Sequence, residues 1–386
     1  MNKLAGTVAG AAIAAAALGG TAMAQDEPIR IGVMLPYSGT FALLGQNITD
    51  AMELAMVERG NGGCNVEYIQ LDSEADPSRG PENARRLIDR DLVDILVGPV
   101  HSGVAMGMVQ VVRETGTPLI IPNAGARQAT AELCAPNIFR TSFSNWQPAY
   151  PSGTVAYDRG ARTAVTLSWD YGAGHQATAA FAEAFEAAGG DVVEELFIPF
   201  PDTNFQPLLT QIAGIQPDAV FVFFAGGGAV QFVNDYDAAG LKDTIPLYGS
   251  GFLTEGVLEA QGDAAEGLLT TLHYGDGLDN PVDAQFRTAF EEATGRPSDV
   301  YAVQGYDTGQ LIAQALEAVS CDVGDLDALS AAMAEATIES PRGTITMSAA
   351  HNPVQDIYLR EARDGENVVI EIAAPALEDP APGCAM

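Results

Sequence analysis

The chain has 386 residues; 47% are hydrophobic, 18% are charged, and 51 acidic side chains stand against 18 basic ones. This composition suffices for a packed core, and the length corresponds to roughly two domains. The formal net charge of −33 argues against a nucleic-acid partner, because affinity for a phosphate backbone comes largely from clustered Lys and Arg. The same charge disfavours docking on anionic lipid.

The first 24 residues predict a secretory signal peptide. Lys3 precedes a charge-free run of small and apolar residues, which leads to the small-x-small pattern Ala22-Met23-Ala24. We expect cleavage after Ala24, so that the mature chain begins at Gln25. A membrane anchor is the alternative, but the run is short and rich in weakly hydrophobic Ala and Gly. No Cys stands at the cleavage site, so a lipid anchor is not expected.

The cysteines form an even set: Cys64, Cys134, Cys321 and Cys384. In an oxidising compartment such a set predicts two disulfides. Four cysteines allow three pairings, and the sequence does not decide between them; we favour Cys64 with Cys321 and Cys134 with Cys384. No C-x-x-C motif is present and the four histidines lie far apart, which disfavours a zinc site. We expect neither a metal nor a cofactor.

Apolar strands and amphipathic helices alternate in the first part of the mature chain. Strands are predicted at 29–35, 65–71, 94–98 and 118–121, and helices at 40–59, 81–90 and 104–113. In the first of these helices, Leu44, Ile48 and Met52 recur at helical spacing. This alternation predicts a parallel sheet covered by helices on both faces.

A second series of the same kind begins after the segment 138–142. Its predicted strands are 163–168, 191–198, 219–224, 246–248 and 267–273, and its predicted helices are 173–188, 205–215 and 226–239. Further helices are predicted at 282–294, 301–318 and 328–336, and further strands at 343–347 and 356–363. The predicted fold class is α/β, with two doubly wound parallel-sheet lobes.

No Pro/Ser-rich linker separates the two series, so we expect three hinge crossovers, near Arg140, Leu269 and Met347. The expected N-terminal lobe comprises 25–141 and 270–346, and the expected C-terminal lobe 142–269 and 347–386. In open α/β sheets, ligands bind beyond the carboxyl ends of the strands. Two facing lobes would therefore share one cleft.

Catalytic motifs are missing from the sequence. It holds no G-x-S-x-G, no G-x-x-x-x-G-K-[ST] and no H-E-x-x-H. Residues 172–177 (GAGHQA) follow a strand and open a helix, as a dinucleotide fingerprint does, but the stretch 197–201 (FIPFP) holds no acidic partner. Glycines of a tight strand-to-helix turn are the preferred interpretation. We do not expect an enzyme.

Three loops at predicted strand ends are suited to binding. Residues 98–103 (GPVHSG) open a helix, so that free backbone N–H groups and the Ser102 hydroxyl can receive an anion. Residues 122–126 (PNAGA) are small and let a ligand approach the backbone, and residues 169–172 (WDYG) add aromatic rings from the other lobe. Singly, each loop is an ordinary strand-to-helix turn; together they favour a binding site.

Six segments carry a resemblance to a known family: IRIGVMLPYSGTFALLG, GPVHSG, IIPNAGA, SWDYG, GDAAEGLLTT and YAVQGYDTGQLI. In this order, and over essentially the whole mature chain, they resemble the leucine/isoleucine/valine-binding protein family, the type I periplasmic solute-binding proteins of ABC transporters. The resemblance implies a monomeric Venus-flytrap protein of the periplasm. Such a protein closes on a small solute and delivers it to a membrane permease without chemical change.

The resemblance also implies roles for individual residues. Ser102 matches the serine whose hydroxyl and N–H hold the ligand carboxylate, and Ala124 and Gly125 match the loop that completes this pocket. Tyr171 matches the aromatic residue that faces the ligand from the second lobe, and Tyr301 matches a wall of the pocket.

A further wall residue is implied at Leu44, where a bulky side chain often lines the pocket. The acidic residue with which amino-acid binders of this family neutralise the ligand ammonium is missing. Gly251 stands at its position in the loop GSGF, beside Phe252. A buried ammonium without a counter-charge is costly, so an α-amino acid is disfavoured.

The expected ligand is an aromatic carboxylate of the benzoate or hydroxycinnamate type. Phe252, Tyr171, Tyr301 and Trp146 offer flat apolar surfaces, and the PNAGA and SFSNWQ segments resemble the aromatic-carboxylate branch of the family. Branched-chain amino acids, or amides and urea, are the alternative ligands. A sensor ectodomain is the competing class of protein, and a secreted hydrolase or dehydrogenase lacks a supporting motif.

Overall fold

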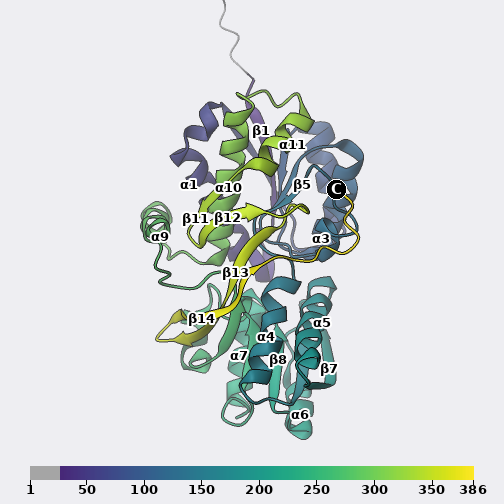
Figure 1. Cartoon of the computed structure of the whole chain (residues 1–386), viewed down its shortest axis with the longest axis vertical. Coiled ribbons are helices and arrows are strands. Elements are labelled where there is room, and N and C mark those ends of the chain that lie inside the picture. The colour runs from purple at the N-terminus through teal and green to yellow at the C-terminus, as the bar shows by residue number, and fades with distance from the viewer. Residues whose placement is uncertain (1–26) are drawn as a thin grey trace, which may run out of the picture.

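The computed structural model describes residues 27–386, and the predicted signal peptide at 1–24 lies outside this part of the chain. Two β-sheets with their covering helices lie one above the other (Figure 1). The α/β class with two lobes, predicted from the sequence, is confirmed. No helix within residues 27–386 has both the length and the apolar character needed to cross a bilayer.

The first sheet has five parallel strands in the order β2-β1-β3-β4-β5. These strands are β1 (Ile29–Leu35), β2 (Val66–Asp72), β3 (Ile95–Val97), β4 (Leu119–Ile121) and β5 (Ile138–Arg140). Successive side chains of β1 enter different cores: Ile31 and Val33 belong to one apolar cluster, whereas Met34 belongs to another with Leu96. Burial on both faces explains why these strands are short continuous apolar runs in the sequence.

Helices cover the first sheet. The helices of this lobe are α1 (Ala42–Glu58), α2 (Arg79–Arg85), α3 (Ser102–Thr115), α9 (Pro281–Thr294), α10 (Val300–Ala318) and α11 (Leu326–Glu335). Among them, α1, α3, α10 and α11 lie around the sheet in the upper half of Figure 1. The helices α1 and α10 pack closely because α10 presents Gly305 and Gly309 to α1. A Cβ atom at either glycine would lie within 3.0 Å of a carbonyl oxygen, that of Ile48 or Met52. This close packing fixes the position of α10.

The second sheet is mixed. The strands β10-β9-β8-β6-β7 run parallel, β13 runs antiparallel to β10, β12 and β14 pair with β13, and β11 pairs with β12. The strands are β6 (Thr163–Asp170), β7 (Asp191–Pro199), β8 (Ala219–Phe223), β9 (Leu247–Ser250), β10 (Leu269–Leu272), β11 (Ile338–Ser340), β12 (Gly343–Met347), β13 (Pro353–Arg363) and β14 (Glu366–Leu377). The helices of this lobe are α4 (Trp146–Asp158), α5 (Gly172–Ala187), α6 (Gln206–Ile215), α7 (Gly226–Ala238) and α8 (Leu258–Gln261).

Four elements of this lobe, α4, α8, β11 and β14, were not predicted, and the purely parallel arrangement was wrong for β11 to β14. The helix α4 holds Pro148 and Pro151, residues that lack an N–H for helical hydrogen bonds and therefore mask the pattern. The strand β14 is mostly exposed or half-buried, and its apolar run at 368–370 is interrupted by Glu371. A tight turn containing Gly365, with φ of 82°, joins it to β13, and such a hairpin makes the pair antiparallel.

Both disulfides have the pairing that we favoured from the sequence. Cys64 is bonded to Cys321, and Cys134 is bonded to Cys384. The second bond holds the C-terminal segment against the first lobe, and Figure 1 places the C-terminus in the upper half of the molecule. Asp379 of this segment also pairs with Arg127 at 3.1 Å. The lobe boundaries expected from the sequence stay a prediction, and these contacts argue for assigning the last residues to the first lobe.

Arg342 joins the segments through which the chain passes between the two sheets. It is buried, and its guanidinium pairs with Asp307 of α10 at 3.0 Å. It also donates to the carbonyl oxygens of Thr141 and Ser142, which follow β5, and to the Gln355 side chain of β13. One side chain therefore ties the first crossover to α10 and to the start of the second sheet's antiparallel part.

We predict that Arg342→Ala strongly destabilises the protein. The substitution leaves the Asp307 carboxylate buried without its partner, and breaking such a pair costs about 3–5 kcal/mol. The matched control is Arg85→Ala, which breaks the exposed Arg85–Glu114 pair and should cost less than about 1 kcal/mol. Guanidinium unfolding of the two variants measures the difference, and equal losses would contradict the role of Arg342.

Candidate ligand-binding site

A cavity lies where the carboxyl ends of the strands of the two sheets face each other. Its lining comes from the loops after β3, β4, β5, β6, β8 and β9 and from the starts of α1 and α10: Phe41, Leu44, Val100, Ser102, Asn123, Gly125, Phe143, Asn145, Tyr171, Ala173, Phe223, Ala225, Phe252 and Tyr301. About 330 Å³ of this space is free of protein atoms, including its opening to solvent. Its lining is mostly apolar and aromatic with a few polar groups, as in small-molecule sites generally.

The N-terminus of α3 supplies the polar end of the cavity. His101 is the N-cap in extended conformation, and its Nδ1 atom accepts the Gly103 N–H at 3.0 Å. Ser102 follows as the first helical residue and is buried. Backbone N–H groups of a first helical turn lack intrahelical partners, and the helix dipole adds positive potential there. The sequence around His101 therefore builds an anion-binding end.

Asn145 connects this end to both lobes. Its N–H donates to the Gly125 carbonyl oxygen at 2.8 Å, and its side-chain amide donates to Ser102 Oγ at 3.3 Å and to Gln176 Oε1 at 2.8 Å. A Cβ atom at Gly125 would lie within 3.0 Å of the Asn145 side chain, so this contact requires glycine. Gln176 of α5 also accepts the Arg127 N–H at 3.0 Å, which fastens the second lobe to the first.

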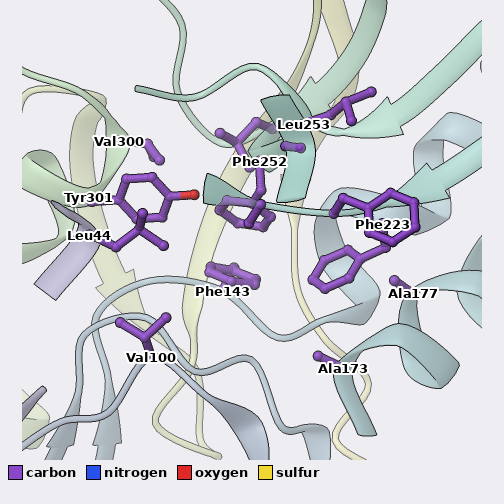
Figure 2. Packing of buried hydrophobic residues seen from close by; sticks show 14 of the residues in the cluster. Leu44, Val100, Phe143, Ala173, Ala177, Phe223, Phe252, Leu253, Val300 and Tyr301 are labelled. Carbon is purple, nitrogen blue, oxygen red and sulfur yellow. The ribbon is translucent and has the colours of Figure 1, made fainter. Parts of the chain in front are cut away.

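Aromatic rings form the other wall of the cavity (Figure 2). The Phe252 ring lies 4.7 Å from that of Phe143 and 6.0 Å from that of Tyr301, measured between centroids. Tyr171 approaches Phe223 at 6.4 Å and the His101 ring at 4.9 Å. Rings from both lobes thus enclose an apolar space beside the anion-binding end.

The basic side chains around the cavity are already engaged. Arg127 pairs with Asp379, and Arg360, which lies beside Gly251, pairs with Glu255. Burial lowers the pKa of Arg140 to about 10, and its guanidinium donates to Thr130, Asn352 and Ala126. Burial also lowers the pKa of His101 to about 4, so this imidazole is neutral at pH 7. The site offers neutral hydrogen-bond donors in place of a cation.

The structure brings six of the nine predicted site residues together at the cavity: Leu44, Ser102, Gly125, Tyr171, Phe252 and Tyr301. Ala124, Trp146 and Gly251 do not line it. The Ala124 N–H is occupied by the Pro99 carbonyl oxygen at 2.9 Å. The Trp146 indole donates to Glu183 at 3.1 Å, and its ring stacks on Tyr150.

Gly251 lies against the side chains of Arg360 and Leu272. A Cβ atom added at position 251 would come within 3.0 Å of both side chains. An acidic side chain does not fit at this position, which agrees with the absence of an ammonium partner expected from the sequence. Residues missed by the sequence analysis include Asn145, Phe143, Asn123 and Phe223. The first two lie in the SFSNWQ segment, whose resemblance to aromatic-carboxylate binders was the available signal.

Comparisons with known proteins agree with this geometry. A family model described as periplasmic binding protein matches residues 28–367. The Leu/Ile/Val-binding protein homolog 6 of Brucella melitensis is 33% identical, and the alignment covers 89% of this chain and 90% of that protein. A solute-binding protein of an ABC transporter from R. palustris, solved in complex with benzoate, has 46% identity and a TM-score of 0.91 over 93% of this chain and 100% of that one.

A solute-binding protein of an ABC transporter from Rhodopseudomonas palustris BisB5, solved in complex with 3,4-dihydroxybenzoic acid, has 32% identity and a TM-score of 0.86, and the alignment covers 92% of this chain and 99% of that one. The two facing α/β lobes and the cavity between them define a ligand-binding protein of the Venus-flytrap class. The chain belongs to the periplasmic binding protein family.

We predict that His101 contributes a pH-dependent part of the stability. Its pKa falls from the ordinary 6.5 to about 4 in the folded state, so between these values the unfolded chain binds the proton and the native state does not. Stability is then lost as pH falls from 6.5 to 4, by about 3 kcal/mol for this group. His101→Asn keeps a capping side chain and should flatten this part of the unfolding profile. An unchanged slope between pH 4 and 6.5 would contradict the prediction.

Proposed function

We propose that this chain is the periplasmic solute-binding protein of an ABC importer and that it captures a single-ring aromatic carboxylate in the cavity between its lobes. The carboxylate binds at the N-terminus of α3, and the ring lies among the aromatic side chains. The closed protein then delivers the ligand to a membrane permease.

The observation that carries the proposal is the pairing of an anion-binding end with an aromatic wall. Ser102 and the first turn of α3 offer donors to a carboxylate, and hydrogen bonds to a charged group are stronger than those between neutral groups. Phe252, Phe143 and Tyr171 offer apolar contact to a ring. An α-amino acid would also bring an ammonium group, which finds no acidic side chain at Gly251.

The relatives support the same class of ligand. The R. palustris protein that was solved with benzoate is 46% identical to this chain, and the BisB5 protein was solved with 3,4-dihydroxybenzoic acid.

The transport role implies an exported protein with two moving lobes. We propose that the leader is cleaved after Ala24 and that the mature protein acts as a monomer. Residues 25–141 with 270–346, and 142–269 with 347–386, are proposed as the two lobes, except that the final segment joins the first lobe through Cys384. Closure brings Gln176 of α5 onto the Arg127 and Gln128 segment, where it now forms hydrogen bonds at 3.0 and 2.6 Å.

Isothermal titration of the mature protein tests the ligand class. We expect at least one compound among benzoate, the hydroxybenzoates and 4-hydroxycinnamate to bind with a Kd at least about tenfold below that of leucine, which corresponds to about 1.4 kcal/mol. Tight binding of leucine, or of an amide or urea, without binding of any aromatic carboxylate would refute the proposal.

A pair of serine variants tests where the carboxylate binds. Ser102→Ala removes a hydroxyl from the anion-binding end and should weaken the aromatic carboxylate about tenfold. Ser152→Ala removes a buried hydroxyl of α4 that does not line the cavity, and it should leave the affinity unchanged.

A further inference from the structure

Tyr301 is held firmly at the start of α10. Asp299 caps this helix by accepting the Ala302 N–H at 2.9 Å, and Asn47 of α1 donates to the same carboxylate at 2.8 Å. The Tyr301 side chain is 1% exposed. Its ring packs 6.0 Å from that of Phe252, so the phenol stands in the aromatic part of the cavity.

The hydroxyl of Tyr301 has no hydrogen-bond partner within residues 27–386. The other polar side chains at the cavity are differently placed: Ser102 Oγ accepts from Asn145, and the Asn123 amide donates to Gln304 at 2.7 Å. Among the lining side chains of the described residues, Tyr301 is the one that combines a fully buried polar atom with no partner.

Figure 2 shows this hydroxyl pointing away from α10, toward the space beside Phe252 and Phe143. Leu44 lies next to the same ring. An unpaired polar group among apolar side chains costs free energy, and native proteins rarely leave one without a reason. A ligand atom that hydrogen-bonds to Tyr301 would remove this cost.

The partner of this hydroxyl is expected on the ring of the ligand, because the carboxylate has its own donors at the start of α3. A phenolic hydroxyl both donates and accepts, as does a hydroxyl substituent of an aromatic ring. Burial raises the pKa of Tyr301 well above 10, so the group remains protonated and can donate.

We propose that the Tyr301 hydroxyl hydrogen-bonds to a hydroxyl substituent on the ligand ring, and that the chain therefore selects hydroxy-substituted aromatic carboxylates over benzoate. This inference rests on the proposed function and adds the residue that determines ligand specificity. Tyr301 thus distinguishes rings that carry a hydroxyl substituent from rings that do not. The N-terminus of α3 binds the carboxylate that all these compounds share.

The test compares Tyr301→Phe with Tyr171→Phe, which removes the same atom from the opposite wall of the cavity. Titrations use benzoate and the 2-, 3- and 4-hydroxybenzoates. We expect the wild type to bind at least one hydroxybenzoate about tenfold more tightly than benzoate. Tyr301→Phe should abolish this preference with less than about a threefold change for benzoate, and Tyr171→Phe should retain it.

Three results would overturn the inference. They are a wild type without preference for any hydroxybenzoate, an equal loss for benzoate and hydroxybenzoates in Tyr301→Phe, and a preference abolished only in Tyr171→Phe. Failure of all aromatic carboxylates to bind the wild type would instead refute the proposed function. Thermal unfolding without ligand is an independent readout: Tyr301→Phe removes an unpaired hydroxyl and should not lower Tm, whereas a lowered Tm would show that the hydroxyl has a partner within the protein.

Discussion

Burial of a carboxylate without a free cation is the constraint on which the site depends. The neighbouring basic groups are committed elsewhere: Arg127 to Asp379 and Arg360 to Glu255, while His101 is neutral. A desolvated anion then requires hydrogen-bond donors that are already in place. In the proposed binding mode the first turn of α3 supplies them, and Asn145 holds Ser102 beside the second lobe. The glycine at 125 follows from the same constraint, since only glycine lets Asn145 approach.

The rest of the fold places an apolar wall opposite those donors. Close packing of α10 on α1 fixes Tyr301, and Arg342 ties α10 to the crossover after β5. The chain has a formal net charge of −33, so it repels an anionic ligand at long range. Salt screens such charges beyond roughly 8 Å, whereas the helix dipole and N–H groups act within the cavity. Recognition is therefore local, and steering by the overall charge is unfavourable.

The strands of the two sheets were largely predictable, because buried parallel strands appear in the sequence as continuous apolar runs. The loops that follow these strands could then be located as well. Ser102, Gly125 and Tyr171 were found in this way, with the help of the family resemblance. Trp146 does not line the cavity, because it lies in a proline-containing helix that was not recognised in the sequence and that turns the indole toward Glu183. Ala124 was implied by the family resemblance, and the structure shows that the Pro99 carbonyl oxygen occupies its N–H. Asn145 and Phe223 come from other strand ends, and only the folded chain brings them to the cavity.

A crystal structure of the mature protein with the aromatic carboxylate that binds most tightly would test the central claim most directly. The carboxylate oxygens should lie at roughly 2.7–3.2 Å from the Ser102 N–H and hydroxyl and from the Gly125 N–H, with the ring between Phe252 and Phe143. A carboxylate paired with an arginine, or a ligand bound outside the space between the lobes, would contradict the account.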